Sequence, residues 1–325
     1  MGRRWYPPRV IVVVGCGVAG LSCAVLLAEA GHAVEIWAAA LPPRTTSNVA
    51  AAFWYPYQAF PRERALRWAA VGYRRFVALA DQPETGIRLR RLVDLYREPV
   101  ARPWWADAVP EHTRLTALER PPGFAEAFAF TSPVVDTRRY LPWLMQRLEA
   151  AGGRVIERRL QTLDEALARA PVVMNCTGLG ARTLASDPEV FPIRGQLVHV
   201  DAPAIEDIVL DEHGPEGLTY MVPRGDHCVL GGTSDPYDDD TAPRPEDSAG
   251  IIERCARIHP ALRDAPRLAE VVGLRPGRSS VRVEAEPRPD GGLVVHDYGH
   301  GGAGVTLSWG CAEEAVALVL GHLRA

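Results

Sequence analysis

Three glycines stand directly between two apolar runs near the start of the chain, in the spacing Gly15-x-Gly17-x-x-Gly20. The β-branched run at 10–14 predicts a buried strand, and the apolar run at 18–30 predicts a helix. This glycine spacing at a strand-to-helix turn is typical of a βαβ unit that binds the pyrophosphate of a dinucleotide at the helix N-terminus. The sequence therefore predicts an α/β fold with a dinucleotide site.

The usual ribose-binding acid of this pattern is missing. The second strand of the unit is expected at 33–38, and an acidic residue at its end normally binds a ribose hydroxyl. Ala39 stands there instead, and Glu35 comes too early and is expected within the strand. We therefore expect affinity to depend mainly on the pyrophosphate contacts, and the case for a nicotinamide cofactor is weakened.

A second glycine-dense turn lies near the other end of the chain. Five glycines occur within the twelve residues from Gly299 to Gly310. A short apolar strand precedes the turn, and an apolar helix is expected to follow it to about Leu323. Glycine allows positive φ and close approach of a ligand to the backbone, and the helix N-terminus favours an electron-rich group. Such turns also join strands and helices without binding anything.

The composition excludes several classes of protein. All 36 basic residues are arginine, so a Schiff-base lysine and a P-loop lysine are both excluded. The net charge of −4 gives no general attraction to nucleic acid or to an anionic membrane. The cysteines form no C-x-x-C pair, so we expect no metal site and reduced core thiols in a cytoplasmic protein. They are Cys16, Cys23, Cys176, Cys228, Cys255 and Cys311.

The uncharged run at 10–28 follows Arg3, Arg4 and Arg9, a pattern also found in signal peptides and membrane spans. The glycine motif in the middle of the run favours a buried strand followed by a buried helix, which has the same hydropathy. No membrane segment is therefore expected here.

The rest of the chain mixes βαβ-like and antiparallel patterns, which indicates two domains interleaved in sequence. Between 87 and 130, strands and loops of a second domain are expected. Polar loops are expected at 211–217 and 235–247. Helices are expected at 61–80, 138–150 (with Asp136 or Thr137 as N-cap), 163–169 and 248–258, and strands at 155–160, 171–175, 196–200, 218–223, 228–231 and 271–274.

Four motifs spread from end to end of the chain carry a resemblance to the D-amino-acid oxidases, flavoenzymes of the glutathione-reductase-like superfamily. The fourth resembles the family signature and is highly specific. Asn175-Cys176-Thr177-Gly178 and Arg194-Gly195-Gln196 also match. The four are Val14-Gly15-Cys16-Gly17-Val18-Ala19-Gly20-Leu21-Ser22; Thr45-Thr46-Ser47 with Val49-Ala50-Ala51 and Trp54; Val272-Gly273-Leu274-Arg275-Pro276; and His296-Asp297-Tyr298-Gly299-His300-Gly301-Gly302-Ala303-Gly304 with Gly310 and Ala312.

The resemblance implies a Rossmann-like FAD-binding domain interleaved with a smaller α+β substrate domain that contains an antiparallel sheet. The FAD-binding domain is expected at 1–55, 134–195 and 270–325, and the substrate domain at 56–133 and 196–269. FAD is expected to bind noncovalently. The expected small-molecule partners are a D-amino acid and O2, with a homodimer as one option for the assembly.

The resemblance also implies roles for individual residues. Arg275 and Tyr220 are expected to hold the substrate α-carboxylate, and the Gly302 carbonyl is expected to accept from the substrate amine. His300 is expected to pack near the flavin. The expected cofactor-binding residues are Gly15, Gly17, Val18, Ala19, Gly20, Thr45, Thr46, Ser47, Ala52, Phe53, Leu160, Cys176, Thr177, Gly178, Gly273, Arg275, His300, Gly301, Gly302, Gly304, Val305 and Thr306.

The implied reaction is oxidative deamination by hydride transfer from the substrate Cα to the flavin. O2 then accepts the electrons, giving hydrogen peroxide, a 2-oxo acid and ammonia, and no protein acid or base is required. The alternatives are a D-aspartate oxidase, a glycine or secondary-amine oxidase, a flavin-dependent D-amino-acid dehydrogenase, and a nucleotide-binding sensor without activity.

The expected substrates have neutral, largely apolar side chains. The substrate pocket is expected to contain Phe53, Tyr55, Tyr57 and Met221, whose walls favour side chains that lose little hydration on entry. D-Aspartate oxidases use extra basic residues for the second carboxylate, and the matching positions here are Ser234 and His213. Arg224 follows Pro223 beside Gly225 and Asp226 and is expected in a surface turn.

Overall fold

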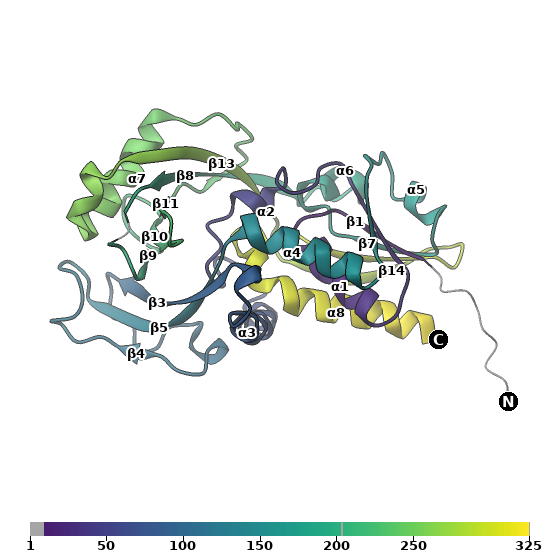
Figure 1. Cartoon of the computed structure of the whole chain (residues 1–325), viewed down its shortest axis with the longest axis horizontal. Coiled ribbons are helices and arrows are strands. Elements are labelled where there is room, and N and C mark those ends of the chain that lie inside the picture. Colours follow the sequence, from purple (N-terminus) through teal and green to yellow (C-terminus); the bar gives the residue numbers. More distant parts are fainter. Residues whose placement is uncertain (1–9, 203, 325) are drawn as a thin grey trace.

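The described part of the chain forms two β-sheets, one of six strands and one of nine (Figure 1). The computed structural model describes residues 10–202 and 204–324; Arg3, Arg4 and Arg9 lie outside them. The six-stranded sheet lies on the right of Figure 1 and the nine-stranded sheet on the left. The expected α/β architecture with an additional antiparallel sheet is confirmed.

The six-stranded sheet has the order β14-β15-β7-β1-β2-β6. Its strands are parallel except β14, which pairs antiparallel with β15 at one edge. Because β1, β7 and β15 run in the same direction, the residues that follow them meet at one edge of the sheet. The strands are β1 (Ile11–Val14), β2 (Val34–Ala38), β6 (Arg154–Glu157), β7 (Val172–Asn175), β14 (Arg282–Pro287) and β15 (Leu293–Tyr298).

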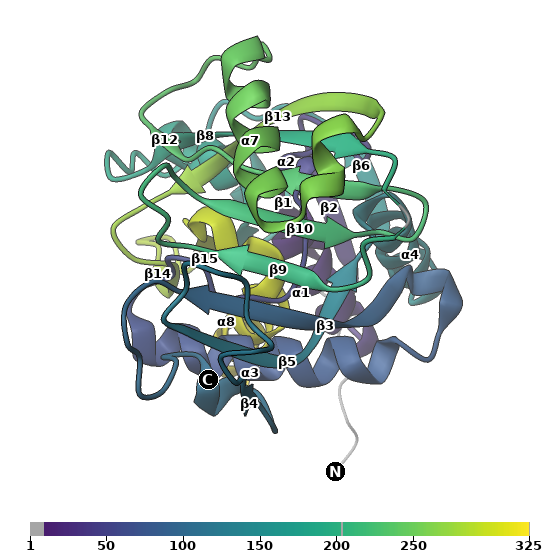
Figure 2. The same cartoon turned by 90° about the vertical axis from the view of Figure 1, so that its left-hand side faces the viewer.

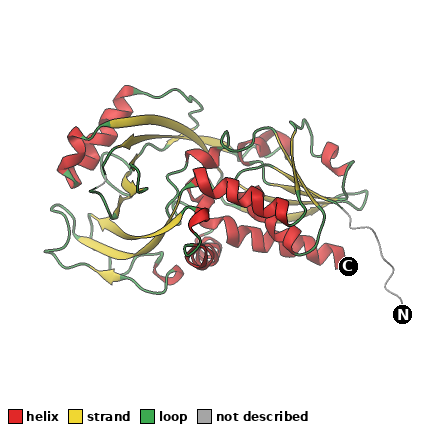
Figure 3. Ribbon diagram, viewed as in Figure 1, coloured by secondary structure: helices red, strands yellow, loops and turns green. Residues whose placement is uncertain are grey.

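Several helices pack around this sheet (Figure 3). α8 packs against α1, α3 and β15. Two glycines allow the close crossing of α3 and α8, because a Cβ on Gly310 would lie 2.3 Å from Trp68 Cα and one on Gly72 would lie 2.2 Å from the Thr306 carbonyl oxygen. The α-helices of the whole described chain, including α7 on the other sheet, are α1 (Val18–Glu29), α2 (Thr46–Val49), α3 (Arg62–Leu79), α4 (Thr137–Ala150), α5 (Asp164–Leu167), α6 (Ala181–Leu184), α7 (Pro245–Ile258) and α8 (Gly304–Arg324), with a short 3₁₀ helix η5 (Gly301–Ala303) before α8.

Two apolar segments have the composition of membrane spans, and the structure gives each a place inside the fold. The run at 10–28 forms most of β1 and α1, both of which belong to the core. α8 is long and apolar enough to cross a membrane by length and composition, but most of its apolar stretch is buried within the protein. Packing against α1 and α3 therefore accounts for the apolar character of α8.

The nine-stranded sheet has the order β12-β8-β11-β10-β9-β3-β5-β4, and β13 also pairs with β8. All of its pairings are antiparallel except β3 with β9. α7 packs on this sheet, as Figure 2 shows. The strands are β3 (Ile87–Tyr96), β4 (Thr113–Arg114), β5 (Glu126–Val135), β8 (Phe191–Val200), β9 (Ile208–Asp211), β10 (Thr219–Pro223), β11 (Cys228–Gly231), β12 (Asp235–Pro236) and β13 (Arg267–Gly277).

β8 and β13 form a long antiparallel pair that runs from the nine-stranded sheet toward the six-stranded one (Figure 1). Both strands are longer than the sequence predicted, because β8 begins at Phe191 and β13 begins at Arg267. In this pair Gly273 lies opposite Gly195, and Arg275 lies opposite Ile193. The pair thereby places the Arg275 motif at the border between the two sheets.

Three short strands, β9, β12 and β14, were not predicted. In β14, charged Arg282, Glu284 and Glu286 alternate with buried Val283, and the strand lies at the sheet edge. Its charged residues mask the apolar signal that marks an interior strand. The segment predicted as one long polar loop also contains the start of α7, which begins at Pro245 rather than at 248.

Candidate active site

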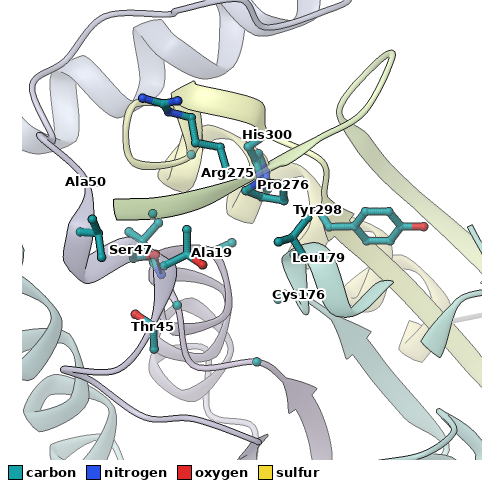
Figure 4. Close-up of a pocket in the computed structure, with 18 of the residues that line it drawn as sticks. Ala19, Thr45, Ser47, Ala50, Cys176, Leu179, Arg275, Pro276, Tyr298 and His300 are labelled. Carbon is teal, nitrogen blue, oxygen red and sulfur yellow. Dashed lines mark hydrogen bonds between the residues drawn. The ribbon is translucent and has the colours of Figure 1, made fainter. Parts of the chain in front are cut away.

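A cavity of about 770 Å3 lies where the two sheets meet. One part is lined by the β1–α1 turn, the segments 44–57 and 158–161, and the segment after β7. The remainder is lined by β8, β10 and β13 and by the glycine turn before α8. In Figure 4, Arg275 and His300 lie at the top of this pocket, and Thr45 and Cys176 lie below them.

The glycine turn after β1 forms one wall of the cavity. Gly15 has a φ of +114°, and a Cβ there would lie 2.4 Å from the Cys176 carbonyl oxygen, so a side chain cannot be accommodated. Gly17, Val18 and Ala19 line the cavity at the start of α1. Gly20 has a different role, because it packs against Gly15, whose oxygen would lie 2.0 Å from a Cβ on Gly20. The exposed N-terminus of α1 can bind an anionic group.

The segment after β2 brings small hydroxylated side chains to the cavity. Thr45 and Asn48 cap the short helix α2, and the Val18 backbone N–H donates to Ser47 Oγ at 3.0 Å. Thr45, Thr46 and Ser47 all line the cavity. The three predicted residues Thr45, Thr46 and Ser47 thus lie together next to the start of α1.

Arg224 was predicted in a surface turn, and this is wrong. Its side chain is buried and turned inward, where Nη2 donates to the carbonyl oxygens of Ala50 at 2.9 Å and Ala51 at 2.5 Å. Nη1 donates to Asp136 at 3.3 Å. Burial lowers the pKa of Arg224 to about 10, despite the nearby Asp136 carboxylate. The physical reason for this position is that the backbone carbonyl oxygens of Ala50 and Ala51 need a hydrogen-bond donor, which Arg224 provides.

The far end of the cavity is lined by Ala39 and by the segment 158–161, which includes Leu160. Arg158 lies over the Trp37 ring at 4.3 Å. The Glu35 carboxylate is bound by other side chains: it accepts hydrogen bonds from Trp37 Nε1 at 3.2 Å and from Arg169 at 2.6 Å. Its position within β2 was predicted correctly, and it does not replace the missing ribose-binding acid.

Arg275, Tyr220 and Gly302 lie at the opposite end of the cavity. Arg275 Nη1 donates to the Thr233 carbonyl oxygen at 3.0 Å. A Cβ on Gly302 would lie 2.5 Å from the Tyr57 ring and 3.6 Å from Arg275 Cδ, so Gly302 is a direct neighbour of both Tyr57 and Arg275. Burial raises the pKa of Tyr220 to about 12, and nearby Arg275 acts in the opposite direction.

Met221 does not belong to this group, which corrects the predicted pocket. Successive side chains of a strand point to opposite faces, so β10 directs Tyr220 to the cavity and Met221 to the other face. There Met221 packs with Ile251 and Cys255 of α7 in a separate apolar cluster. Phe53 and Tyr55 do line the cavity, and the Phe53 ring lies 5.6 Å from the Tyr220 ring.

A family model described as FAD dependent oxidoreductase matches residues 11–318. The chain belongs to this family of FAD-dependent oxidoreductases. It is 51% identical over 308 residues to a D-amino-acid oxidase of Rubrobacter xylanophilus, covering 94% of each chain. It is 44% identical over 315 residues to a D-amino-acid oxidase of Streptomyces coelicolor, covering 95% of this chain and 96% of that one. A human D-aspartate oxidase is 37% identical over 323 residues, covering 95% and 94%.

Solved structures resemble this oxidoreductase in fold. The glycine oxidase of Geobacillus kaustophilus superimposes with a TM-score of 0.79 at 21% identity, covering 96% of this chain and 95% of that one. The L-proline dehydrogenase of P. horikoshii superimposes with a TM-score of 0.77 at 17% identity, covering 96% and 93%. At these identities the likeness concerns the arrangement of the two sheets and not the substrate.

The cavity of this oxidoreductase fits FAD, the cofactor of the family. The glycine turn after β1 (Gly15, Gly17 and Gly20), called the glycine cradle below, and the N-terminus of α1 suit a pyrophosphate. The glycine turn before α8 offers backbone at the other end, where an isoalloxazine ring would lie near Arg275. Of the predicted cofactor-binding residues, all line the cavity except Gly20, which supports the cradle from behind.

Behind the second glycine turn of the oxidoreductase lies a buried polar cluster. His300 lines the cavity, and its Nε2 lies 3.0 Å from the Asp297 carboxylate. The Cys23 thiol donates to the other oxygen of Asp297 at 3.3 Å. Cys176 lies with Cys23 and Asp297 in one group of potential metal ligands, and Cys311 lies with Asp297 and His300 in another. The contact with Asp297 holds the His300 ring, and the expectation of no metal stays a prediction.

Two carboxyl groups near Tyr55 were missed in the sequence. Tyr55 Oη donates to Glu212 at 2.8 Å and lies 3.3 Å from Asp94 Oδ2. Tyr96 Oη at 2.5 Å and Trp105 Nε1 at 2.6 Å donate to the same oxygen of Asp94. Burial raises the pKa of Asp94 to about 7, against these donors. The available signal was an acidic residue within the apolar, buried second half of β3, next to Val93 and Leu95.

Proposed function

We propose that this oxidoreductase catalyses oxidative deamination of D-amino acids with neutral, largely apolar side chains. The products are a 2-oxo acid, ammonia and hydrogen peroxide, with O2 as the electron acceptor. The observation that carries the proposal is the grouping of Arg275, Tyr220 and Gly302 at the end of a cavity whose other end is a glycine cradle. Relatives named D-amino-acid oxidase at 51% and 44% identity support it.

Arg275 provides the anchor for the substrate. A guanidinium can make two parallel charge-assisted hydrogen bonds to a carboxylate, which sets the orientation as well as the affinity. In the unliganded site Nη1 donates to the Thr233 and Arg194 carbonyl oxygens, which hold the side chain in place. Arg275 thus presents its remaining donors to an α-carboxylate, and Tyr220 Oη offers a further hydrogen bond.

The Gly302 carbonyl would accept from the substrate amine. With the carboxylate and the amine both fixed, the orientation of the Cα–H bond is fixed as well, and such orientation is a large source of rate enhancement. When bound, FAD supplies the electron acceptor for the hydride and passes the electrons to O2. The backbone N–H groups of Val305 and Thr306, at the start of α8, would stabilise negative charge on the reduced flavin.

Apolar walls support the substrate preference. Phe53, Leu210 and Leu218 line the cavity beside Tyr220. The basic residue that could have served an acidic substrate, Arg224, is engaged by Ala50, Ala51 and Asp136. An acidic side chain would therefore lose hydration without gaining a cationic partner from Arg224.

We further propose that the protein works in the cytoplasm and that a homodimer is its assembly. The two domains would follow the predicted division, with 1–55, 134–195 and 270–325 as the FAD-binding domain and 56–133 and 196–269 as the substrate domain. The grouping of the strands into two sheets supports this division, although residues 191–195 and 270–277 contribute to the nine-stranded sheet.

The deciding experiment is an oxygen-uptake screen of the purified yellow protein over D- and L-amino acids, with peroxide measured in parallel. The proposal expects uptake and peroxide with D-valine, D-leucine and D-methionine, and little with their L-enantiomers. Higher kcat/KM on D-aspartate would indicate a D-aspartate oxidase. Activity only on glycine or sarcosine would indicate an amine oxidase, and substrate oxidation with an artificial acceptor but without peroxide would indicate a dehydrogenase.

FAD is proposed to bind noncovalently. Acid precipitation should then release the yellow chromophore into the supernatant, and the colourless protein should recover its spectrum when FAD is added. Colour that remains with the precipitate would contradict noncovalent binding.

A further inference from the structure

Two buried carboxyl groups meet at the hydroxyl of Tyr55, a residue of the cavity wall. Tyr55 Oη donates to Glu212 Oε2 at 2.8 Å, and Asp94 Oδ2 lies 3.3 Å from the same hydroxyl. Asp94 is 1% exposed, and the Glu212 side chain is 8% exposed. Because a hydroxyl carries a single proton, Tyr55 cannot fully satisfy both carboxyl groups.

Neither carboxyl group has an arginine partner within the described residues. The basic side chain within ion-pair distance of Glu212 in the described part of the chain is His213, whose Nε2 is 3.9 Å away and whose side chain is 71% exposed. Arg97 passes through the same region but pairs with the neighbouring Asp211 at 2.7 Å. In a chain with 36 arginines, this end of the cavity has acidic groups without compensating guanidinium groups.

Charges of opposite sign therefore lie at and behind the cavity wall. Arg275 lines the cavity and provides the positive charge. Glu212 provides the negative charge at the hydroxyl of the cavity residue Tyr55, joined by Asp94 when Asp94 is ionised. Burial raises the pKa of Tyr57, nearby Arg275 lowers it and Glu212 raises it, so Tyr57 is near both charges. A substrate whose α-carboxylate binds Arg275 would have its side chain directed away from the guanidinium, toward the apolar wall and Tyr55.

We propose that Glu212, with Asp94, determines substrate specificity by rejecting D-amino acids that carry a second carboxylate. This inference rests on the proposed function. Repulsion between like charges is strong in a site shielded from water, because the effective dielectric constant is low. Discrimination can be achieved by an unfavourable contact with the wrong substrate as well as by favourable contacts with the right one. The substrates accepted are those with neutral or cationic side chains.

The test is the substitution Glu212→Gln, which removes the charge and keeps an oxygen that can accept from Tyr55. The quantity measured is the ratio of kcat/KM for D-glutamate to that for D-leucine, which have side chains of similar size. Removing one of the repelling charges should raise this ratio at least about tenfold, mainly through a lower KM for D-glutamate. The ratio of kcat/KM for D-arginine to that for D-leucine should fall in the same variant.

Glu216→Gln is the matched control. Glu216 lies four residues away in the same loop, pairs with exposed Arg257 at 2.5 Å, and its substitution gives the same change in net charge. The ratio should stay within about twofold of the wild-type value, because an exposed charge is screened by solvent. An equal rise in Glu216→Gln, or no rise in Glu212→Gln, would overturn the proposal.

Ligand binding gives a readout independent of turnover. Valerate and glutarate have the same unbranched five-carbon chain and differ by a second carboxylate in place of the terminal methyl group. Their binding to the FAD-loaded protein can be followed through the perturbation of the flavin absorbance, and valerate serves as the neutral reference in place of a branched acid such as isovalerate. Glu212→Gln should tighten glutarate relative to valerate at least about tenfold. Unchanged relative affinity would count against the proposal.

Asp94→Asn gives a second variant should Glu212→Gln not retain FAD. Burial raises the pKa of Asp94 to about 7, so the ratio should rise in the same direction when it is measured above this pH, where Asp94 is ionised. The two levels of inference fail in different ways. Absence of oxidation of any D-amino acid by the wild type would overturn the proposed function, whereas oxidation with an unchanged D-glutamate to D-leucine ratio in both variants would overturn this inference alone.

Discussion

The guanidinium of Arg275 lies directly over Gly195, so that a Cβ on Gly195 would be 2.3 Å from Arg275 Nη1. The two residues belong to β13 and β8, which pair antiparallel. Arg275 can reach the cavity along this path because residue 195 has no side chain. The position of Arg275, the proposed substrate anchor, therefore depends on a residue in the facing strand.

Gly195→Ala should displace the Arg275 side chain and lower kcat/KM for D-amino acids at least about tenfold, because the two hydrogen bonds to the carboxylate need a fixed geometry. The displaced atoms are the far end of a flexible side chain, so Tm and FAD content should change little. Gly321→Ala is the control, since its Cβ would meet nothing within 4 Å. Full activity in Gly195→Ala would argue against the anchoring role.

Arg275→Ala should lower kcat/KM at least about a hundredfold while FAD stays bound. Hydrogen bonds to charged groups contribute about 1.5–3 kcal/mol each, and two would be lost. Arg275→Lys separates charge from geometry: a point charge should recover only part of the loss. Steady-state kinetics and the flavin spectrum check this, and near-normal turnover in Arg275→Ala would show that the carboxylate binds elsewhere.

Ala39→Glu should tighten FAD binding. Ala39 lines the cavity immediately after β2, where a carboxylate could accept from a ribose hydroxyl. One hydrogen bond to a charged group corresponds to about a tenfold change in Kd. Titration of the apoprotein with FAD, followed by flavin fluorescence, measures the effect, with Ala39→Gln as the uncharged control. Clear weakening in Ala39→Glu would contradict a ribose near this position.

Asp94 should make the folded state less stable as the pH rises from about 4 to about 7. Burial raises its pKa from 3.8 to about 7, so in this window the folded protein binds more protons than the unfolded one, and its stability falls with rising pH. Asp94→Asn should remove this fall, on the order of 4 kcal/mol over the whole window.

Urea unfolding at several pH values from about 4.5 to about 8, a range that spans the shifted pKa, measures the difference in unfolding free energy between Asp94→Asn and the wild type. Asp107→Asn is the control, because the hydrogen bond from Arg102 lowers the pKa of Asp107 and its titration lies below this window. A variant whose stability falls with pH as steeply as the wild type would show that Asp94 is already ionised when folded.

The sequence allowed the prediction of those parts of the fold and site that depend on local pattern. Gly15 and Gly17 were predicted because a tight turn under a pyrophosphate requires glycine at fixed spacing, and Arg275 was predicted through its motif; all three line the cavity. Met221 was placed wrongly although the alternation of strand side chains, applied to neighbouring Tyr220, predicts the opposite face.

The position of Arg224 could not be obtained in this way. Its partners are the carbonyl oxygens of Ala50 and Ala51, which lie 174 and 173 residues away in the chain. Local sequence at Pro223 and Gly225 does indicate a turn, but which carbonyls come near that turn is decided by the packing of the two sheets. The meeting of Asp94 and Glu212 at Tyr55 is non-local for the same reason.

The order of strands in the six-stranded sheet has a consequence for the newly made protein. β7 lies between β1 and β15, and β15 is followed only by α8. The wall formed by the turn before α8, and the core contact between α1 and α8, are completed by the last part of the described chain to leave the ribosome. Flavin capture should therefore follow the synthesis of β15 and α8, and a nascent chain that ends before β15 should not retain FAD. Until these elements are made, the edge of β7 that pairs with β15 and the face of α1 that contacts α8 lack their partners.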